Sequence, residues 1–521
     1  MTTDKPRFCL IDNALTSLVG HFLEYDKVVM DNLDASKFDR LMFSNADFLD
    51  ASRFGYIPSF YTNFWNISKT KRPLSPSRKD LPSCGAFVGM DRLLSQNDLR
   101  QIDMYRQDLI NVMDIFSLST EDLLFFPNIN PKELFAILQI IEGLRGRLPY
   151  LKFVLRRNIF VGPPDRLQVM VNPSREVLLL RLIFERLEKY KSSGKISFYT
   201  DSERLKDEYE VVAPFEFKVL PVPFRHSMIR EKSRISGPLR IVYLGDARSE
   251  KGFQHIPALV RAMKDHIDAG RIEFILQTSS HSELVIKNAI AELRKFERGV
   301  TLLSEPLTDE EYYNLLNSAD ISLIFYDPKQ YYSRTSCIFV ESVISCTPFI
   351  TSSGSWMESV MDTGTGEVVD DFMDLPKTLT RMIDHYEEYV ITLNAGKNRW
   401  MESNAGSRFV SILMDGVKTD MSSAMPVVTP GSLKKKYLRL WFDIWARINY
   451  STLGLFFALL LHGKEVWKVA RGEDLPPGLV GYIRLAPRPL LFIGQHAVAF
   501  ARKVLAFKQY ISVRLADTFK H

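Results

Sequence analysis

The stretch LRIVYLGDARSEKGFQHIPALV, residues 239–260, decides the fold class. Its first part is an apolar run with β-branched residues, as in a buried strand, and its last part has the apolar spacing of a helix. The loop between them contains Gly245, Arg248 and Lys251. A glycine turn that leads into a helix N-terminus, with cations beside it, can hold a diphosphate. A solvated basic loop with a helix cap is the alternative.

Strand and helix patterns alternate on both sides of this stretch. Short apolar runs typical of strands are separated by longer periodic segments typical of helices. The expected strands are 7–12, 39–44, 122–128, 151–158, 196–201, 239–245, 272–278, 300–305 and 320–326. Such alternation predicts parallel sheets with helices on both faces. We therefore expect an α/β fold with two Rossmann-like, doubly wound domains and a ligand cleft at the carboxyl ends of the strands.

The chain has 521 residues, which requires more than one core, because single cores stop growing at about 250–300 residues. The proline-containing segment 219–238 interrupts the alternation and favours a linker there. We expect an N-terminal Rossmann-like domain over 1–222, a linker over 223–238, a second Rossmann-like domain over 239–419 and a helical tail over 420–521.

The composition excludes several classes of protein. A hydrophobic fraction of 46% with 25% charged residues is that of a globular protein. The cysteines are scattered without a C-x-x-C pair, which argues against a disulfide framework or a zinc site and fits a reducing compartment. They are Cys9, Cys84, Cys337 and Cys346. The N-terminus lacks the apolar core of a secretory signal. The longest apolar run, 453–461, is well short of the roughly 20 residues that span a bilayer.

Three motifs of the second half carry a resemblance to a known family. The first is YLGDARSEKGF, from Tyr243, which resembles the opening of the donor domain in GT-B glycosyltransferases of the bacterial, nucleotide-sugar-dependent group 1 or family 4-like type. Asp246 occupies the usual arginine position, and Arg248 lies close by. The resemblance implies that Arg248 and Lys251 are catalytic, by stabilising the leaving diphosphate, and that Gly245 contacts the donor.

The other two motifs lie in 305–328 and from Tyr331 onward. The latter resembles the donor-binding segment, in which Glu341 matches the second Glu of an E-x7-E pattern. The resemblance implies that FVESVIS is a helix, that TPFITS is a strand, and that Glu341 accepts hydrogen bonds from ribose hydroxyls. A solvent-exposed helical glutamate is the alternative. Arg334 and Ser336 would meet the diphosphate at the helix N-terminus, whereas Ser333 replaces the first Glu.

The first half offers weaker matches. Gly20 and His21 lie in a loop that resembles the glycine-bearing loop beside the acceptor. The resemblance implies that Gly20 contacts the donor and that His21 is a catalytic candidate, with a helix cap as the alternative for His21. Arg156 and Arg157 follow an expected strand at a position where many family members have a histidine, and an arginine pair can neutralise an anionic group. Surface salt bridges are the alternative for them. Asn128 is a further acceptor-side candidate. Residues 389–413 resemble the terminal helices that cross back to the first domain.

The resemblance implies a hexosyltransferase that moves a sugar from a nucleotide-sugar donor to a glycan or lipid-linked acceptor in bacterial surface polysaccharide or glycoconjugate synthesis, with retention of configuration. No Asp-x-Asp pair is placed to hold a metal ion, so we expect no catalytic metal and no cofactor, and we expect no nucleic-acid partner. A nucleotide-sugar epimerase on the same scaffold and a degenerate scaffold of a membrane-bound glycan assembly complex are the alternatives.

The tail differs in charge from the rest of the chain. From Gly431 onward there are fifteen Lys and Arg against five Asp and Glu, a net charge of +10, whereas the whole chain carries +5. The segment 434–448 places Leu438, Trp441 and Trp445 on one helical face flanked by cations. Such a helix favours a membrane surface or another subunit as partner. We expect a cytoplasmic protein at the inner face of the cell membrane.

Overall fold

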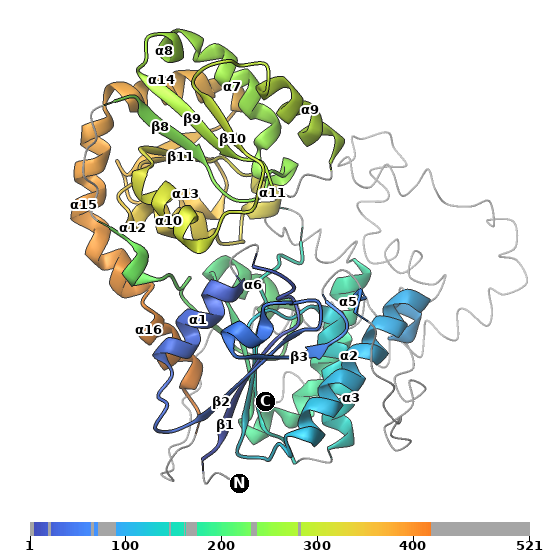
Figure 1. Cartoon of the computed structure of the whole chain (residues 1–521). Helices are drawn as coiled ribbons and strands as arrows, with labels where there is room; N and C mark the ends of the chain where they lie inside the picture. Colours follow the sequence, from blue (N-terminus) through green and yellow to red (C-terminus); the bar gives the residue numbers. More distant parts are fainter. Residues whose placement is uncertain are drawn as a thin grey trace, which may run out of the picture. The chain divides into compact units, whose positions relative to one another are not determined.

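The structure is a computed structural model (Figure 1). It describes residues 5–18, 22–63, 67–70, 90–144, 147–160, 162, 174–230, 237–279 and 283–417. The predicted amphipathic tail over 420–521 therefore lies outside the described residues. Within the described ranges, no helix is long and apolar enough to cross a membrane.

The first domain is built on a seven-stranded parallel sheet with the order β3-β2-β1-β4-β5-β6-β7. Its strands are β1 (Arg7–Asp12), β2 (Asp39–Asn45), β3 (Tyr56–Phe60), β4 (Leu123–Phe126), β5 (Tyr150–Val154), β6 (Ile196–Thr200) and β7 (Phe217–Val219). Its helices are α1 (Phe22–Asn32), α2 (Gln96–Ile115), α3 (Pro131–Gly143), α5 (Arg175–Leu187) and α6 (Glu203–Val212). Helices α2, α3 and α5 pack side by side (Figure 1).

The second domain has a six-stranded parallel sheet with the order β10-β9-β8-β11-β12-β13. Its strands are β8 (Leu239–Tyr243), β9 (Ile272–Gln277), β10 (Val300–Leu303), β11 (Ile321–Ile324), β12 (Phe349–Ser352) and β13 (Gly366–Val369). Its helices are α7 (Ile256–Ala262), α8 (Lys264–Asp268), α9 (Leu284–Leu293), α10 (Asp309–Ser318), α11 (Pro328–Tyr331), α12 (Cys337–Ile344), α13 (Trp356–Val360) and α14 (Leu375–Asp384). Two parallel, doubly wound sheets confirm the predicted fold class.

Two terminal helices connect the second domain back to the first, as predicted. They are α15 (Tyr386–Ser403) and α16 (Gly406–Met414). The Phe409 ring of α16 packs edge-on against Tyr25 of α1, with ring centroids 5.2 Å apart. A Cβ on Gly406 would lie 2.4 Å from the Asn32 amide nitrogen, so glycine allows α16 to approach α1 closely. The core of the first domain thereby includes residues from the end of the described chain.

Local signals explain where the helices begin. Asn130 and Glu133 form a reciprocal capping box at the start of α3, and Thr308 and Glu311 form another at the start of α10. Each box satisfies backbone N–H groups that the first turn of a helix leaves without partners. The expected helix over 255–267 is divided at Met263 into α7 and α8.

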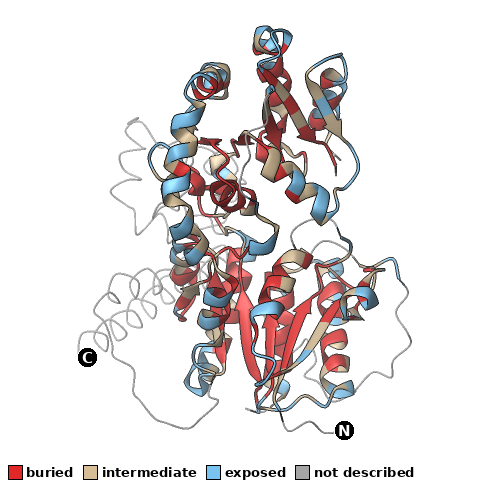
Figure 2. Ribbon diagram, turned by 60° about the vertical axis from the view of Figure 1, so that its left-hand side comes forward, coloured by how far each residue is buried: buried red, intermediate tan, exposed pale blue. Residues whose placement is uncertain are grey.

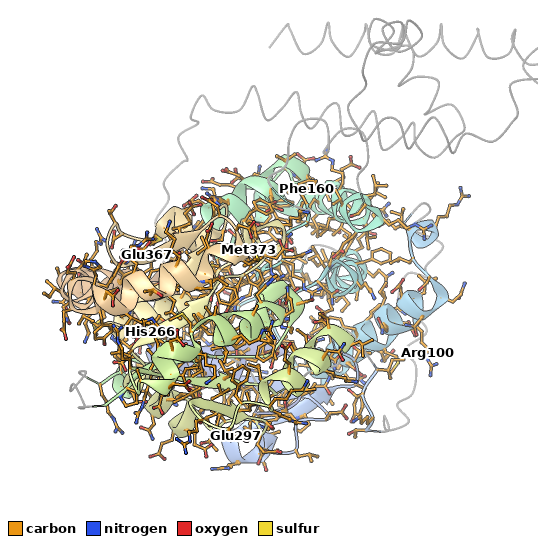
Figure 3. The ribbon with its side chains drawn as sticks, turned by 90° about the horizontal axis from the view of Figure 1, so that it is seen from above. Arg100, Phe160, His266, Glu297, Glu367 and Met373 are labelled. Carbon is orange, nitrogen blue, oxygen red and sulfur yellow. The ribbon has the colours of Figure 1, made fainter. Side chains whose placement is uncertain are left out.

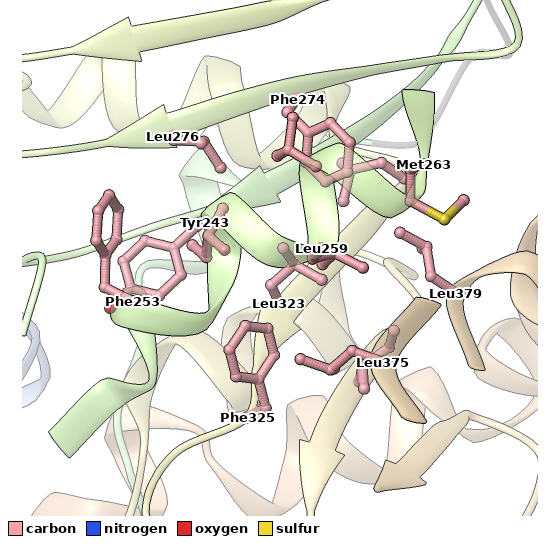
Figure 4. Packing of buried hydrophobic residues seen from close by; sticks show 14 of the residues in the cluster. Tyr243, Phe253, Leu259, Met263, Phe274, Leu276, Leu323, Phe325, Leu375 and Leu379 are labelled. Atoms are coloured by element: carbon pink, nitrogen blue, oxygen red, sulfur yellow. The ribbon is translucent and has the colours of Figure 1, made fainter. Parts of the chain in front are cut away.

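Each sheet buries its strands between helices. The core of the second domain includes Tyr243, Phe253 and Leu323, and the Tyr243 and Phe253 rings meet edge-on (Figure 4). In the first domain the central strands β1, β4, β5 and β6 are almost wholly buried, whereas parts of β2, β3 and β7 and the outer helix faces are at least partly exposed (Figure 2). Arg100 and Glu297 are both exposed, and their side chains project outward from the protein surface (Figure 3). Because the strands are covered on both faces, side chains reach a ligand only where the strands end.

Candidate active site

A cavity of about 390 Å³ is lined by residues of both domains. It opens at the carboxyl ends of the strands, because Asp12 ends β1, Asp201 follows β6, and Gly245 follows β8. This is the predicted place for a ligand in doubly wound sheets. Its polar and charged lining consists of Asp12, Glu24, Asn128, Arg156, Arg157, Asp201, Asp246, Arg248, Lys251, Gln277, Thr308, Asp309, Arg334 and Thr335, with tyrosines 25, 312, 313 and 331.

The donor-side cations that the sequence predicted are brought together in this cavity. Arg248, Lys251 and Arg334 all line it, as does Gly245. Gly245 has a φ of +85°, and a Cβ there would lie 3.1 Å from the Lys251 ammonium nitrogen. The glycine therefore serves both the left-handed turn and the close approach of the lysine. The predicted grouping is present, whereas the roles of its members remain predictions.

Lys251 is a buried cation beside two arginines and two carboxylates. Its exposed fraction is 9%. Burial, followed by the positive charge of Arg248, lowers the pKa of the Lys251 ammonium to about 8. The negative charges of Asp246 and Glu250 partly offset these cations. The Glu250 oxygens lie 2.9 Å from Arg248 and 3.8 Å from Arg334. An incoming dianion would relieve the repulsion between Lys251 and Arg248.

Helix α12 begins at the cavity wall. Cys337, its first residue, lines the cavity. Ser336 is the N-cap: its hydroxyl accepts a hydrogen bond from the Phe339 N–H at 3.2 Å. Ser336 is buried and its side chain does not line the cavity. The positive end of the α12 dipole, rather than the serine hydroxyl, is the feature that faces an anion.

Glu341 lies in α12, which confirms the prediction that FVESVIS is a helix, and β12 confirms the predicted strand in TPFITS. The alternative of an exposed glutamate is wrong, because the side chain is 4% exposed. Its carboxylate accepts hydrogen bonds from the hydroxyls of Tyr312 at 2.5 Å and Tyr313 at 3.2 Å. Burial raises the Glu341 pKa to about 7.

The two tyrosines separate Glu341 from the main cavity. Tyr312 and Tyr313 line that cavity, whereas Glu341 lines a neighbouring small pocket of about 10 Å³. A ribose hydroxyl that bonded to the Glu341 carboxylate would therefore compete with the hydroxyls of Tyr312 and Tyr313. The predicted contact between Glu341 and ribose remains a prediction.

The loop before α12 shows what replaces the missing first Glu. Ser333 is fully buried and does not line the cavity. Tyr331, Arg334 and Thr335 face it instead. The Arg334 guanidinium lies over the Tyr331 ring, 4.6 Å from its centroid. A stacked arginine therefore occupies the part of the loop where the resemblance led us to look for a carboxylate.

The first domain contributes a mixed-charge wall. Arg156, Arg157 and Asn128 line the cavity, as the sequence suggested. The Arg156 guanidinium stacks on the Tyr25 ring, 3.8 Å from its centroid. Among the described residues, its Nε and Nη2 atoms are buried without a hydrogen-bond partner.

Sequence reasoning missed the carboxylates of this wall, Asp12 and Asp201. Each lies at or just after the carboxyl end of a strand, and that position was the available signal. Burial raises the pKa of both carboxylates, that of Asp12 to about 6. The positive charge of Arg156 opposes both shifts. The wall therefore combines hydrogen-bond acceptors with a fixed cation, which suits a hydroxyl-bearing ligand.

Two predicted residues lie outside the described part of the chain. These are Gly20 and His21. The flanking residues Leu18 and Phe22 line the cavity. In the ranges that the structure describes, no three His, Cys, Asp or Glu side chains are grouped to hold a metal ion. The expectation of metal-independent chemistry remains a prediction.

Comparison with known proteins identifies the architecture. No family model matches the sequence, and no curated protein matches it significantly. Solved structures do match: sucrose-phosphate synthase from Thermosynechococcus elongatus has a TM-score of 0.54 at 13% identity, over 78% of this chain and 97% of that chain. HepE from Anabaena, in complex with UDP and glucose, has a TM-score of 0.53 at 12% identity, over 80% and 100%. A glycosyltransferase from Rickettsia africae has a TM-score of 0.52 at 10% identity, over 80% and 100%. These similarities show that the chain has the predicted GT-B fold.

Proposed function

We propose that this protein is a glycosyltransferase that moves a sugar from a nucleotide-sugar donor to an acceptor. The observation that carries the proposal is the convergence of Arg248, Lys251 and Arg334 with the N-terminus of α12 in one cavity. A nucleoside diphosphate matches this combination of fixed cations and a helix dipole. The neighbour bound to UDP and glucose and the neighbour named as a glycosyltransferase support the same ligand class and reaction class.

The chemistry that we propose rests on the leaving group. Negative charge grows on the diphosphate as the bond to the sugar breaks, and preorganised cations stabilise that charge. Glu250 pairs with both Arg334 and Arg248, and the Tyr331 ring also holds Arg334, so the two guanidinium groups need little reorganisation. Lys251, with a pKa of about 8, is mostly charged at neutral pH. In this proposal the fixed cations act without a metal ion, and retention of configuration follows from the resemblance alone.

The acceptor side is proposed to be the first-domain wall. Asn128, Arg156 and Arg157, together with Asp12 and Asp201, provide both donors and acceptors for sugar hydroxyls. We propose a glycan or lipid-linked acceptor of bacterial surface polysaccharide synthesis.

The basic tail would hold the enzyme at a membrane surface or at another subunit. Flotation with anionic vesicles tests this: the full chain should float and a chain ending at Val417 should not, and equal behaviour of both would contradict it.

The reaction class is tested by nucleotide release. The full chain is incubated with UDP-, ADP- and GDP-linked hexoses, and free nucleotide is separated by chromatography. We expect release from at least one donor, strong loss of release in Lys251→Met, and unchanged release in Lys264→Met, which removes an exposed lysine that pairs with Asp268. No release or transfer from any donor would refute the proposal.

A further inference from the structure

The junction of β6 and α6 in the first domain contacts a loop of the second domain directly. The Ser202 hydroxyl donates a hydrogen bond to the carbonyl oxygen of Ser333, and both residues are buried. The Arg204 guanidinium donates through Nη1 to the carbonyl oxygen of Tyr332 at 2.8 Å and to that of Ser355 at 3.3 Å. Two successive carbonyl groups of one loop are therefore held by two nearby side chains of the opposite domain.

A third contact lies at the cavity itself. The Thr335 hydroxyl donates a hydrogen bond to the Asp201 carboxylate at 2.8 Å, and both residues line the cavity. Along the chain, Arg334 lies between Ser333, whose carbonyl group is bound, and Thr335, whose hydroxyl is bound. The loop backbone is thus fixed from the first domain on either side of the residue that presents a cation to the proposed diphosphate.

We propose that the segment Asp201–Arg204 positions the loop Tyr331–Ser336 and thereby sets donor affinity from the opposite domain. The inference rests on the proposed function, because it assigns donor binding to this loop. Arg204 is a positioning residue: it is exposed, it does not line the cavity, and it acts through the backbone of Tyr332. A loop that is already ordered loses less conformational entropy when a ligand binds, so anchoring it strengthens binding.

Arg204→Ala is the informative variant. Ser202 is less suitable because its hydroxyl also caps α6, accepting a hydrogen bond from the Leu205 N–H at 3.0 Å. Lys206→Ala is a matched control on the same helix, since Lys206 pairs with Glu203 of that helix at 3.6 Å. Arg204→Lys retains a cationic donor group and should restore part of the wild-type affinity.

The measurement is the Kd for UDP, ADP and GDP by calorimetry, with donor KM and kcat for nucleotide release. We expect Arg204→Ala to raise the Kd and donor KM about two- to tenfold, the factor for one or two lost hydrogen bonds. The kcat at saturating donor, the melting temperature and the Lys206→Ala values should stay near wild type.

The outcomes separate this inference from the proposed function. If wild-type protein binds a diphosphate and Arg204→Ala binds it equally well, only the positioning role is overturned. Equal weakening in Lys206→Ala, or loss of kcat rather than of donor affinity, also overturns it. If wild-type protein binds no diphosphate, the proposed function and this inference both fail.

Discussion

Lys251 should give nucleotide binding a defined dependence on pH. Burial, and then the positive charge of Arg248, lowers the pKa of the Lys251 ammonium to about 8. The charged fraction then falls from about one half at pH 8 to about one tenth at pH 9. If a diphosphate binds the charged form, its Kd rises up to about fivefold over that interval. The sign follows because the lysine loses its positive charge as the pH rises.

The other groups of the cluster should change little in this range. The pKa of Arg248 is raised, so its guanidinium remains charged. Glu341, with a pKa of about 7, is mostly ionised by pH 8. Titration calorimetry with UDP, ADP or GDP at pH 7.5 to 9.5 gives the profile, and Lys251→Met is the control that should weaken binding and flatten it. A flat wild-type profile, or the same slope in Lys251→Met, would refute the reasoning.

Three further outcomes follow from the structure. The Glu341 pKa is about 7, against an ordinary 4.5, so the folded state holds this proton more tightly than the unfolded state. The free energy of unfolding should therefore fall as the pH rises from 4.5 to 7. In urea unfolding this fall should be up to about 3 kcal/mol larger for the wild type than for Glu341→Gln. Gly252→Ala should cost about 2 kcal/mol or more, because its Cβ would lie 2.6 Å from the Phe325 carbonyl oxygen at a φ of +79°. Gly270→Ala, with a φ of +65° and no atom within 4 Å of its Cβ, should cost less in the same assay. Nucleotide release should persist in EDTA, and loss that Mg²⁺ or Mn²⁺ restores would contradict the proposed metal independence.

The two sheets were predictable because their strands are buried on both faces and therefore appear as continuous apolar runs. Helix α2 was missed although Ser95 and Asp98 form a capping box at its start. More than half of its residues are polar or charged, and it packs against α3 and β3, which the sequence alone does not place. The short edge strands β3, β7 and β13 were also missed, since three to five residues carry little periodicity.

The candidate site was predictable where one continuous motif forms it. Gly245, Arg248 and Lys251 lie within seven residues of one another in a single strand–loop–helix unit, and all three line the cavity. The position of Glu341 behind Tyr312 could not be predicted in this way. That contact joins α12 to a helix 29 residues earlier, and its formation depends on how α10 packs against the sheet.

The most direct test of the central claim is calorimetric titration of UDP, ADP and GDP into wild-type protein, Lys251→Met and Lys264→Met at pH 7. We predict that wild-type protein binds at least one diphosphate, that Lys264→Met binds it equally well, and that Lys251→Met raises the Kd by about tenfold or more, as expected for a lost charge-assisted hydrogen bond of about 1.5–3 kcal/mol. Absence of binding to all three diphosphates, or unchanged affinity in folded Lys251→Met, would contradict the claim that this cavity holds a nucleotide diphosphate.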